Sequence, residues 1–356
     1  MITQISKTMK AIKKTHNTVG MTFQQDVPVP QIGPNDVLIA VTHAGICGTD
    51  RHIYEWDAWS SSRVALNTTI GHEFVGKTVK IGSAVTRVSL GQRVSAEGHI
   101  GCGTCQPCRT GNGHICNSVD ILGIDTHGCF AQFVAVPQEN VWPVHPSIPN
   151  EIAAIMDALG NAVHTVMAPG VSGKEILITG VGIIGLMAVT VAKAAGAGKI
   201  IVTDTDDKRL AIAKELGADL ALNALDDQWT QQARAATGDQ GPSVLLEMSG
   251  QPTAIKDGFN LLRNGGTVAM LGIPSKEVSF DLANQIIFKG ATILGINGRK
   301  MFNTWYQMQN FLLSGRLNLK PIITHQIKMQ DFDQGFKMMQ SGQAIKVVME
   351  IPQHQS

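Results

Sequence analysis

The pattern of hydrophobic and polar positions divides the 356-residue chain into two parts of different character. Up to about residue 160, short runs rich in β-branched residues stand between turn-forming residues, as at residues 37–41 and 133–136. Runs of this length bounded by turn residues are typical of β-strands. We therefore predict that the first part forms an irregular, mostly β domain.

From about residue 175, apolar runs of strand length alternate with stretches of helix length. The expected strands lie at residues 176–179, 200–203, 244–247, 267–271 and 292–294, and the expected helices at residues 183–195, 207–216 and 304–313. This alternation predicts a parallel sheet covered by helices on both faces. The predicted fold class is therefore α/β, with a Rossmann-type doubly wound sheet beside the β-rich domain.

Composition narrows the possible partners. Hydrophobic residues make up 44% of the chain, and the formal net charge is +1. A charge this close to zero gives no electrostatic footprint for nucleic acid or an anionic membrane, so neither is expected as a partner. The uncharged stretch at residues 176–192 is marginal for a span of ~20 residues, and its glycines favour a strand, a turn and a helix instead. Residues 1–8 show no export signal and the thiols suit a metal, so we expect a cytoplasmic protein.

Four of the six cysteines form the sharpest motif in the chain. Cys102, Cys105, Cys108 and Cys116 follow the spacing C-x2-C-x2-C-x7-C, among glycines and a proline that break regular structure. Two-residue spacers let a tight loop turn successive thiolates onto one ion, and a structural zinc binds four ligands in a closed tetrahedron. Two disulfides, an iron–sulfur cluster or four unrelated core cysteines are the alternatives. We predict a structural zinc that stabilises a lobe at residues 98–117 and takes no part in chemistry.

A glycine-rich sequence follows the first strand of the second part. Gly180, Gly182 and Gly185 match G-x-G-x-x-G and lie between a predicted strand and a predicted helix. Such glycines allow a tight turn and let backbone N–H groups approach a pyrophosphate at the helix N-terminus. Asp204 ends the second strand, where an acid accepts hydrogen bonds from the adenosine ribose and repels a 2′-phosphate. The motif predicts NAD rather than NADP, while Arg209 could either stack near the adenine or remain a solvated helix residue.

Cys47 and the adjacent pair His72 and Glu73 form a second candidate metal site. Taken singly, a cysteine is more often a small buried hydrophobe, and a histidine a core residue. A catalytic zinc, however, uses about three protein ligands and leaves one position for water or substrate. Because a dinucleotide motif lies in the same chain, we predict that these three residues surround a catalytic zinc.

At these residues the chain resembles the zinc-containing medium-chain dehydrogenases, from about residue 9 to residue 352. The resemblance rests on the cysteine lobe, the glycine-rich loop, Gly45-Ile-Cys47-Gly-Thr49-Asp50, and Gly71-His72-Glu73-x2-Gly76-x5-Gly82-x2-Val85. Five further stretches resemble the members of that family that oxidise L-threonine. They are His52-Ile-Tyr-x-Trp56-Asp-x-Trp59, Glu97-Gly-His99-Ile, Gly160-Asn161-Ala-Val-His164-Thr165, Glu247-Met-Ser-Gly250 and Gly298-Arg299-x-Met301-Phe302-x-Thr304-Trp305-Tyr306.

The resemblance implies roles for the matching residues. Thr49 and His52 would relay a proton away from the substrate, and His99 would shape the choice of substrate. Asp157 would serve as a further zinc ligand or adjust the position of the metal. Taken alone, His52 and His99 are each compatible with a purely structural role. The implied cofactor contacts are Gly180, Gly182, Ile184, Gly185, Asp204, Arg209, Leu271, Gly272, Ile273, Ile296 and Asn297, with Arg299 as a candidate partner for the pyrophosphate.

The activity implied by the resemblance is zinc- and NAD-dependent oxidation of L-threonine at its hydroxyl group, giving 2-amino-3-oxobutanoate, by a homotetramer with two zinc ions per chain. The implied domains are a catalytic domain at residues 1–158, a dinucleotide domain at 159–299, and a C-terminal segment at 300–356 that packs back on the first. A polyol or other secondary-alcohol dehydrogenase of the same family is the main alternative. A catalytically inactive, NAD-binding zinc protein that senses redox state is another, although the intact set of candidate catalytic residues argues against it.

Overall fold

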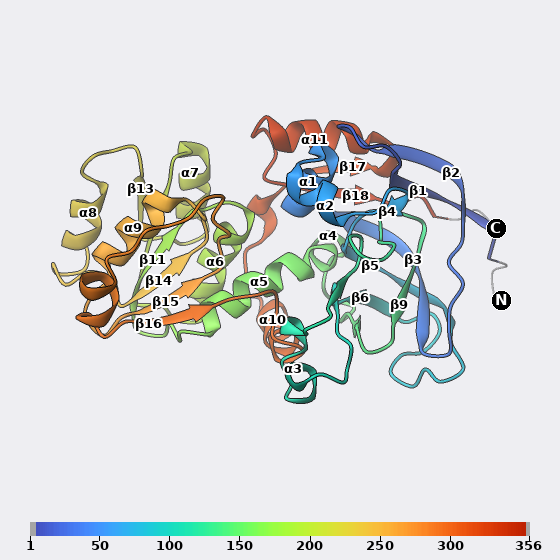
Figure 1. Ribbon diagram of the computed structural model, residues 1–356, viewed down its shortest axis with the longest axis horizontal. Coiled ribbons are helices and arrows are strands. Elements are labelled where there is room, and N and C mark those ends of the chain that lie inside the picture. Colours follow the sequence, from blue (N-terminus) through green and yellow to red (C-terminus); the bar gives the residue numbers. More distant parts are fainter. Residues whose placement is uncertain (1–4, 354–356) are drawn as a thin grey trace. The chain divides into compact units, whose positions relative to one another are not determined.

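The computed structural model describes residues 5–353, which divide by their internal contacts into two compact units (Figure 1). One unit contains the described residues up to Ala158 together with those from Ile323 onward, and the other runs from Leu159 to Ile322. Residues 1–4, which belong to the stretch without a visible export signal, lie outside the described residues.

The first unit is built on antiparallel β-structure, as the short β-branched runs predicted. Its main sheet has seven strands in the order β10-β6-β5-β3-β18-β17, with β9 also paired to β3. Two smaller sheets, β2-β1-β4 and β7-β8, complete the strands of this unit. The strands are β1 (Thr8–Lys14), β2 (Thr22–Pro28), β3 (Asp36–Gly45), β4 (Thr68–Thr69), β5 (Glu73–Ile81), β6 (Arg93–Ala96), β7 (His99–Ile100), β8 (Asp120–Ile121), β9 (Phe133–Pro137), β10 (Val141–Pro143), β17 (Ile323–Lys328) and β18 (Lys346–Glu350).

Short helices connect these strands and cover the sheet. They are α1 (Gly48–Glu55), α2 (Ala58–Arg63), α3 (Gln106–Arg109), η1 (Gly113–Ile115), α4 (Asn150–Ala154), η4 (Met329–Asp331) and α11 (Phe332–Gln340), and α5 (Met156–Met167) begins here. The strand β3 is long enough to pair with two partners on one side, β9 along its first half and β18 along its last three residues. The C-terminal strand β18 therefore lies beside the end of β3, just before Cys47 (Figure 1).

The second unit contains the doubly wound sheet that the sequence predicts, so the predicted fold class is confirmed. Its six strands are all parallel, in the order β13-β12-β11-β14-β15-β16. In chain order this is the 3-2-1-4-5-6 arrangement of dinucleotide-binding folds. The strands are β11 (Glu175–Thr179), β12 (Lys199–Asp204), β13 (Leu220–Asn223), β14 (Val244–Glu247), β15 (Thr267–Met270) and β16 (Thr292–Gly295).

The helices of the second unit connect and flank these strands. They are α6 (Ile183–Ala194), α7 (Asp207–Glu215), α8 (Trp229–Ala235), α9 (Pro252–Leu261), the π-helical turn η2 (Ala283–Ile287), α10 (Asn303–Leu313) and η3 (Lys320–Ile322). The sequence reading did not find β13, since it is a four-residue edge strand that contains alanine and asparagine, which have little preference for strands. The uncharged stretch at residues 176–192 consists of β11 and most of α6. Among the described helices, none is both long and apolar enough to cross a membrane.

The second unit continues beyond residue 299, where the sequence analysis ended the dinucleotide domain. Both α10 and η3 belong to it, and the chain joins the first unit at Ile323. One contact that holds this segment is the hydrogen bond from the backbone N–H of Asn318 to Oγ1 of Thr190 on α6, at 3.1 Å. The two residues are 128 positions apart in sequence, and no local pattern predicts their contact.

Candidate metal centres and dinucleotide site

The strand pairing of the first unit brings Cys47 to His72 and Glu73. Cys47 lies between β3 and α1, Glu73 begins β5, and the antiparallel register places Gly45 opposite Glu73. The candidate ligand atoms of the three residues lie within 4.8 Å of one another. The three predicted residues are therefore adjacent in space, as a metal site requires.

A buried lysine from the C-terminal strand completes this cluster. The Nζ atom of Lys346 on β18 lies 2.5 Å from Oε2 of Glu73 and donates to the backbone oxygen of Ile46 at 2.9 Å. Both charged side chains are almost fully excluded from solvent. A Cβ atom at Gly45 would lie 2.4 Å from Oε2 of Glu73, so glycine is needed there for the ion pair to form. Burial alone would lower the pKa of Lys346, but Glu73, Cys47 and Asp50 together outweigh this effect and raise the pKa.

Asp50 adds a further buried carboxylate beside His72. Its Oδ2 atom accepts a hydrogen bond from the backbone N–H of Cys47 at 2.8 Å, and its Oδ1 atom lies 3.7 Å from Nδ1 of His72. Burial raises the pKa of Asp50 to about 6. Burial alone would lower the pKa of His72, but Asp50 and Cys47 outweigh it and raise the pKa to about 10. The cluster therefore favours positive charge at its centre.

The donor atoms of this cluster fit a zinc ion. Within the described chain, Oδ1 of Asp50 and Oε1 of Glu73 are buried without a hydrogen-bond partner. Buried acceptors in this state are costly unless a cation or a donor compensates them. A thiol, an imidazole and a carboxylate are the ligand types that zinc takes in proteins, and three of them leave one position open. Cys47, His72 and Glu73 could hold such an ion, while Oε2 of Glu73 is paired with Lys346.

Asp157 is buried near this cluster but is not one of the three residues whose ligand atoms meet. It lies in the first turn of α5, and its Oδ1 atom accepts a hydrogen bond from the backbone N–H of Gly98 at 3.4 Å. The sulfur of Cys129 is also close, donating to the backbone oxygen of Glu73 at 3.6 Å. Burial raises the pKa of Cys129 well above its ordinary value, so this thiol stays neutral.

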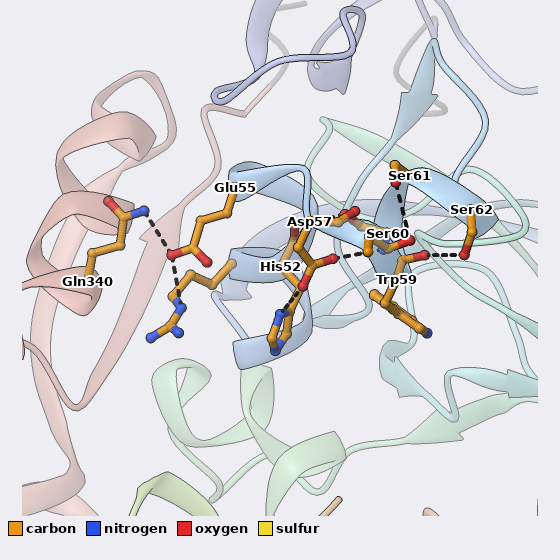
Figure 2. Close-up of polar contacts among 10 residues, drawn as sticks. His52, Glu55, Asp57, Trp59, Ser60, Ser61, Ser62 and Gln340 are labelled. Atoms are coloured by element: carbon orange, nitrogen blue, oxygen red, sulfur yellow. Dashed lines mark hydrogen bonds and ion pairs between the residues drawn. The ribbon is translucent and has the colours of Figure 1, made fainter. Parts of the chain in front are cut away.

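The two residues of the predicted proton relay lie one turn apart on α1. The Oγ1 atom of Thr49 is 3.9 Å from Sγ of Cys47, in a partly buried contact at the start of the helix. His52 lies toward the solvent, with its side chain 50% exposed. Its Nδ1 atom is 2.6 Å from Oδ2 of Asp57, a residue that the sequence analysis did not single out (Figure 2). The two side chains thus lie on one helix, Thr49 near Cys47 and His52 toward solvent.

His99 is oriented by a buried carboxylate in the same way. Its Nδ1 atom lies 3.0 Å from Oε1 of Glu97, and its backbone N–H donates to the same oxygen at 2.9 Å. Glu97 is fully buried, whereas the His99 side chain is 14% exposed. The imidazole is therefore held by Glu97, which lies just before β7, and the His99 side chain stays partly exposed.

The four cysteines of the lobe converge as their spacing predicts. Their sulfur atoms lie within 4.8 Å of one another, and no disulfide joins any of the chain's six cysteines, all of which fall in the described range. Backbone N–H groups point at the sulfurs, as from Cys105 to Cys102 at 3.4 Å and from Ser118 to Cys116 at 3.3 Å. Hydrogen bonds from Thr104 lower the pKa of Cys102 to about 5. Four converging sulfurs with backbone N–H groups directed at them fit a closed metal site.

The glycine-rich loop has the geometry of a dinucleotide turn. Gly180 has a φ of +83°, and a Cβ atom there would lie 2.7 Å from Cα of Ser249. A Cβ atom at Gly185 would lie 2.1 Å from the backbone oxygen of Gly180, so only glycine permits this approach of helix and strand. Gly182 caps α6 with open space beside its Cα and no side-chain cap. The N–H groups at this helix N-terminus can therefore receive a pyrophosphate.

The acid at the end of β12 lies next to this loop. Oδ2 of Asp204 accepts a hydrogen bond from the backbone N–H of Val181 at 2.8 Å, and Oδ1 accepts one from Asp206 at 3.0 Å. An ionised carboxylate has about four acceptor positions, so capacity remains for ribose hydroxyls. Arg209 on α7 lies 3.7 Å from Asp206 through its Nε atom.

The other predicted cofactor residues follow the carboxyl ends of strands in the same sheet. Ile184 lies in the first turn of α6, Leu271, Gly272 and Ile273 follow β15, and Ile296 and Asn297 follow β16. Ile296 also lines a pocket of about 490 Å³ formed with residues of α5 and α10. Arg299 is buried against Gly160 and donates to Oδ1 of Asn161 at 3.2 Å.

Sequence reasoning gave no role to three residues that shape these sites, although two of them lie in the quoted motifs. Asp50 follows Cys47 by three residues, the spacing of a helix-capping pair, and that signal could have found it. Glu247 is fully buried at the end of β14, where it accepts from Ser249 and Gly250 beside the glycine-rich loop. Lys346 lies 300 residues from Ile46, and nothing in the local pattern predicts their contact.

Comparisons with known proteins agree with both halves of this architecture. The family model described as zinc-binding dehydrogenase matches residues 184–314, and that of the alcohol dehydrogenase GroES-like domain matches residues 33–146. A relative from Bacillus velezensis, named L-threonine 3-dehydrogenase, is 46% identical over 342 residues, covering 96% of this chain and 98% of the relative.

Solved structures resemble the chain over nearly its whole length. An alcohol dehydrogenase from Escherichia coli CFT073, solved with NADH, gives a TM-score of 0.89 at 25% identity, covering 97% of this chain and 100% of the other. A protein from Sinorhizobium meliloti 1021 solved with NADP gives a TM-score of 0.88 at 26% identity, with the same coverage. Since these two neighbours carry different cofactors, the choice between them must be argued from this chain's own residues.

Proposed function

This chain belongs to the zinc-binding alcohol dehydrogenase family with a GroES-like domain, and on that premise we propose that it oxidises the hydroxyl group of L-threonine with NAD, giving 2-amino-3-oxobutanoate. The observation that carries the chemistry is the meeting of Cys47, His72 and Glu73 beside buried acceptors that a cation would compensate. The choice of substrate is supported by relatives named L-threonine 3-dehydrogenase that are 43–46% identical to this chain.

A zinc ion held by Cys47, His72 and Glu73 would act as a Lewis acid that makes a bound hydroxyl group more acidic. The chain's own residues then have two tasks. Lys346 orients Glu73 through the buried ion pair, in which Nζ lies 2.5 Å from Oε2. Thr49 receives the hydroxyl proton and passes its own proton to His52, which releases it to solvent. Asp157 is proposed to adjust the metal's position rather than to belong to the central set.

We propose NAD as the hydride acceptor, bound with its pyrophosphate at the N-terminus of α6. Asp204 supports this choice because a carboxylate beside the loop accepts hydrogen bonds from the ribose and repels a 2′-phosphate. The change of Asp204→Ser with Thr205→Arg is expected to shift kcat/KM toward NADP by at least about tenfold. A wild-type protein that reduces NADP as efficiently as NAD would contradict this role of Asp204.

His99 is the residue proposed to help select threonine. The substrate carries an ammonium and a carboxylate beside its hydroxyl group, and a site without polar partners would desolvate them at high cost. Glu97 holds the His99 ring in place, so the imidazole is a fixed partner rather than a mobile one. We assign the contact with the substrate to the exposed part of the His99 side chain.

A substrate panel with NAD tests this function. We expect NADH formation with L-threonine at a higher kcat/KM than with 2,3-butanediol or sorbitol. The variant His99→Ala should lower the ratio of kcat/KM for threonine over 2,3-butanediol while NAD affinity and zinc content stay unchanged. Oxidation of sorbitol without oxidation of threonine would assign the chain to the polyol dehydrogenases instead, and NAD binding without turnover of any alcohol would indicate a redox sensor.

The proposal extends to two zinc ions per chain, a homotetramer and a cytoplasmic location. The second zinc would be held by Cys102, Cys105, Cys108 and Cys116. Association of copies is supported by β16 at the sheet edge and by exposed apolar side chains on and near it, Ile287, Phe288 and Ile293. A native-mass measurement of the purified protein decides the number of copies.

A further inference from the structure

Asp57 holds His52 from a position outside the helix that carries it. The Oδ2 atom of Asp57 lies 2.6 Å from Nδ1 of His52, and its Oδ1 atom accepts a hydrogen bond from the backbone N–H of Ser60 at 2.9 Å (Figure 2). Asp57 is thus the N-cap of α2 and the partner of the imidazole at the same time. The carboxylate has little freedom to turn away, because the helix N-terminus binds its other oxygen.

Two neighbours strengthen this arrangement. The hydroxyl group of Ser60 donates to the backbone oxygen of His52 at 2.9 Å, which fastens the end of α1 to α2. The ring of Trp59 meets the ring of His52 edge to face, with their centroids 6.2 Å apart. The imidazole is therefore held at Nδ1 and along one side although half of it is exposed.

The contact decides which nitrogen of His52 carries the proton. Burial alone would raise the pKa of Asp57, but hydrogen bonds from Ser60 and His52 outweigh it and lower the pKa, so the group is a carboxylate at neutral pH. A carboxylate only accepts hydrogen bonds, so Nδ1 of a neutral His52 must donate. The lone pair of the neutral ring then lies on Nε2, the nitrogen directed away from Asp57.

We propose that Asp57 is a positioning residue for proton transfer: it keeps Nε2 of His52 as the nitrogen that takes up and releases the relayed proton. This inference rests on the proposed function, in which His52 receives a proton from Thr49. In each turnover the substrate hydroxyl loses one proton and a base in solvent gains it, while Thr49 and His52 end unchanged. The negative charge of Asp57 also stabilises the imidazolium that exists between the two transfers.

Glu55 provides a matched control, because it is a carboxylate on α1, the helix that carries His52. Its Oε1 atom pairs with Nε of Arg51 at 3.2 Å and accepts from Gln340 at 3.0 Å (Figure 2). It is a partly exposed carboxylate near His52 in sequence, but it pairs with Arg51 and Gln340.

The test variant is Asp57→Asn. Asparagine caps helices as well as aspartate does, so this change removes the charge and keeps the cap of α2.

The kinetic test compares Asp57→Asn, Glu55→Gln, His52→Ala and the double variant of His52 and Asp57. We expect Asp57→Asn to lower kcat by about tenfold, less than in a fully buried Asp–His pair, with KM and melting temperature nearly unchanged. Added imidazole should restore much of the lost rate, because it replaces the impaired proton acceptor. Glu55→Gln should match the wild type, and Asp57→Asn should cause no further loss once His52 is alanine.

The second measurement does not depend on turnover. Nitrogen-15 NMR of histidine-labelled protein, with the His52 signals assigned from His52→Ala, should show a protonated Nδ1 in the wild type and a shift toward protonated Nε2 in Asp57→Asn. If threonine is not oxidised, the proposed substrate is wrong, and the kinetic series is run with the alcohol that the panel identifies. The role of Asp57 is overturned by a wild-type His52 protonated at Nε2, by an unchanged kcat in Asp57→Asn, or by an equal loss in the His52→Ala background.

Discussion

The two candidate metal centres differ in every feature that can be compared. The cysteine lobe takes four ligands of one kind from residues 102–116, and its sulfurs are stabilised by nearby N–H groups at the surface. The cluster of Cys47, His72 and Glu73 takes three different ligands from two segments, one that follows β3 and one at the start of β5. The buried charged side chains of Asp50 and Lys346 lie beside it. A closed set of equal ligands suits stability, whereas an incomplete, mixed set leaves a position for chemistry.

The two centres also differ in how the charge of their ligands is compensated. The lobe is partly exposed to solvent, and backbone N–H groups donate to its sulfurs, so its thiolates need no buried cation from the protein. The buried cluster contains the carboxylates of Asp50 and Glu73, and Lys346 on β18 compensates part of their negative charge. A site designed to act on a substrate must exclude water, and it must therefore bring its own compensating charges.

The largest expected effect is the loss of activity in Cys47→Ser. Removing one of three ligands should abolish the Lewis-acid contribution of several kcal/mol, which corresponds to a fall in kcat of about 10³-fold or more. The melting temperature should change little, because Lys346 still compensates Glu73. Metal analysis should find one zinc per chain in this variant and two in the wild type. A single zinc in fully active wild-type protein would remove the distinction between the two centres.

The next largest effect is expected for Lys346→Met, which leaves Glu73 buried without its ammonium partner. Breaking a buried ion pair in this way costs about 3–5 kcal/mol in the free energy of unfolding. The loss should be greater in chelator-treated protein, since a metal ion beside Glu73 would supply part of the missing positive charge. Urea unfolding with and without chelator measures both values.

The double variant Lys346→Met with Glu73→Gln is the control, and it should recover part of the stability. If Lys346→Met alone were as stable as the wild type, the ion pair between Lys346 and Glu73 would not contribute to the free energy of unfolding.

The smallest global effect is expected for Cys105→Ser in the lobe. Metal binding and folding are coupled in such loops, so residues 98–117 should lose protection from hydrogen exchange. The free energy of unfolding of the whole chain should fall by less than about 2 kcal/mol, because the lobe contributes few residues to the hydrophobic cores. Loss of protection throughout the first unit would contradict this separation of lobe and core.

Local patterns in the sequence were sufficient to predict the fold class and the loops that a single segment of the chain forms. The glycine-rich turn needs residues 180–185 and one acid at residue 204, and the strand and helix around it match the predicted ranges within one residue. The cysteine spacing likewise predicts the meeting of four sulfurs, which the structure contains. Family membership is confirmed by the comparisons, while the chemical roles of these residues stay predictions.

Contacts between distant segments could not be predicted from the sequence alone. Lys346 meets Glu73 because β18 pairs with the last residues of β3, and a strand's partner is not encoded in its own alternation. Asp57 could be seen as a residue before a short helix, but its contact with His52 depends on how the chain turns between α1 and α2. The second unit extends to Ile322 through contacts such as the hydrogen bond between Asn318 and Thr190, which also joins distant segments.

The late position of β18 also orders the events of synthesis on the ribosome. Chains emerge from the N-terminus, and their domains fold as units while the rest is still being made. Cys47, His72 and Glu73 emerge early, but Glu73 has no ammonium partner until Lys346 follows, after the complete second unit has been made. The unit that is second in the chain can therefore finish folding first, and the buried cluster in the first unit closes only after Lys346 has been translated.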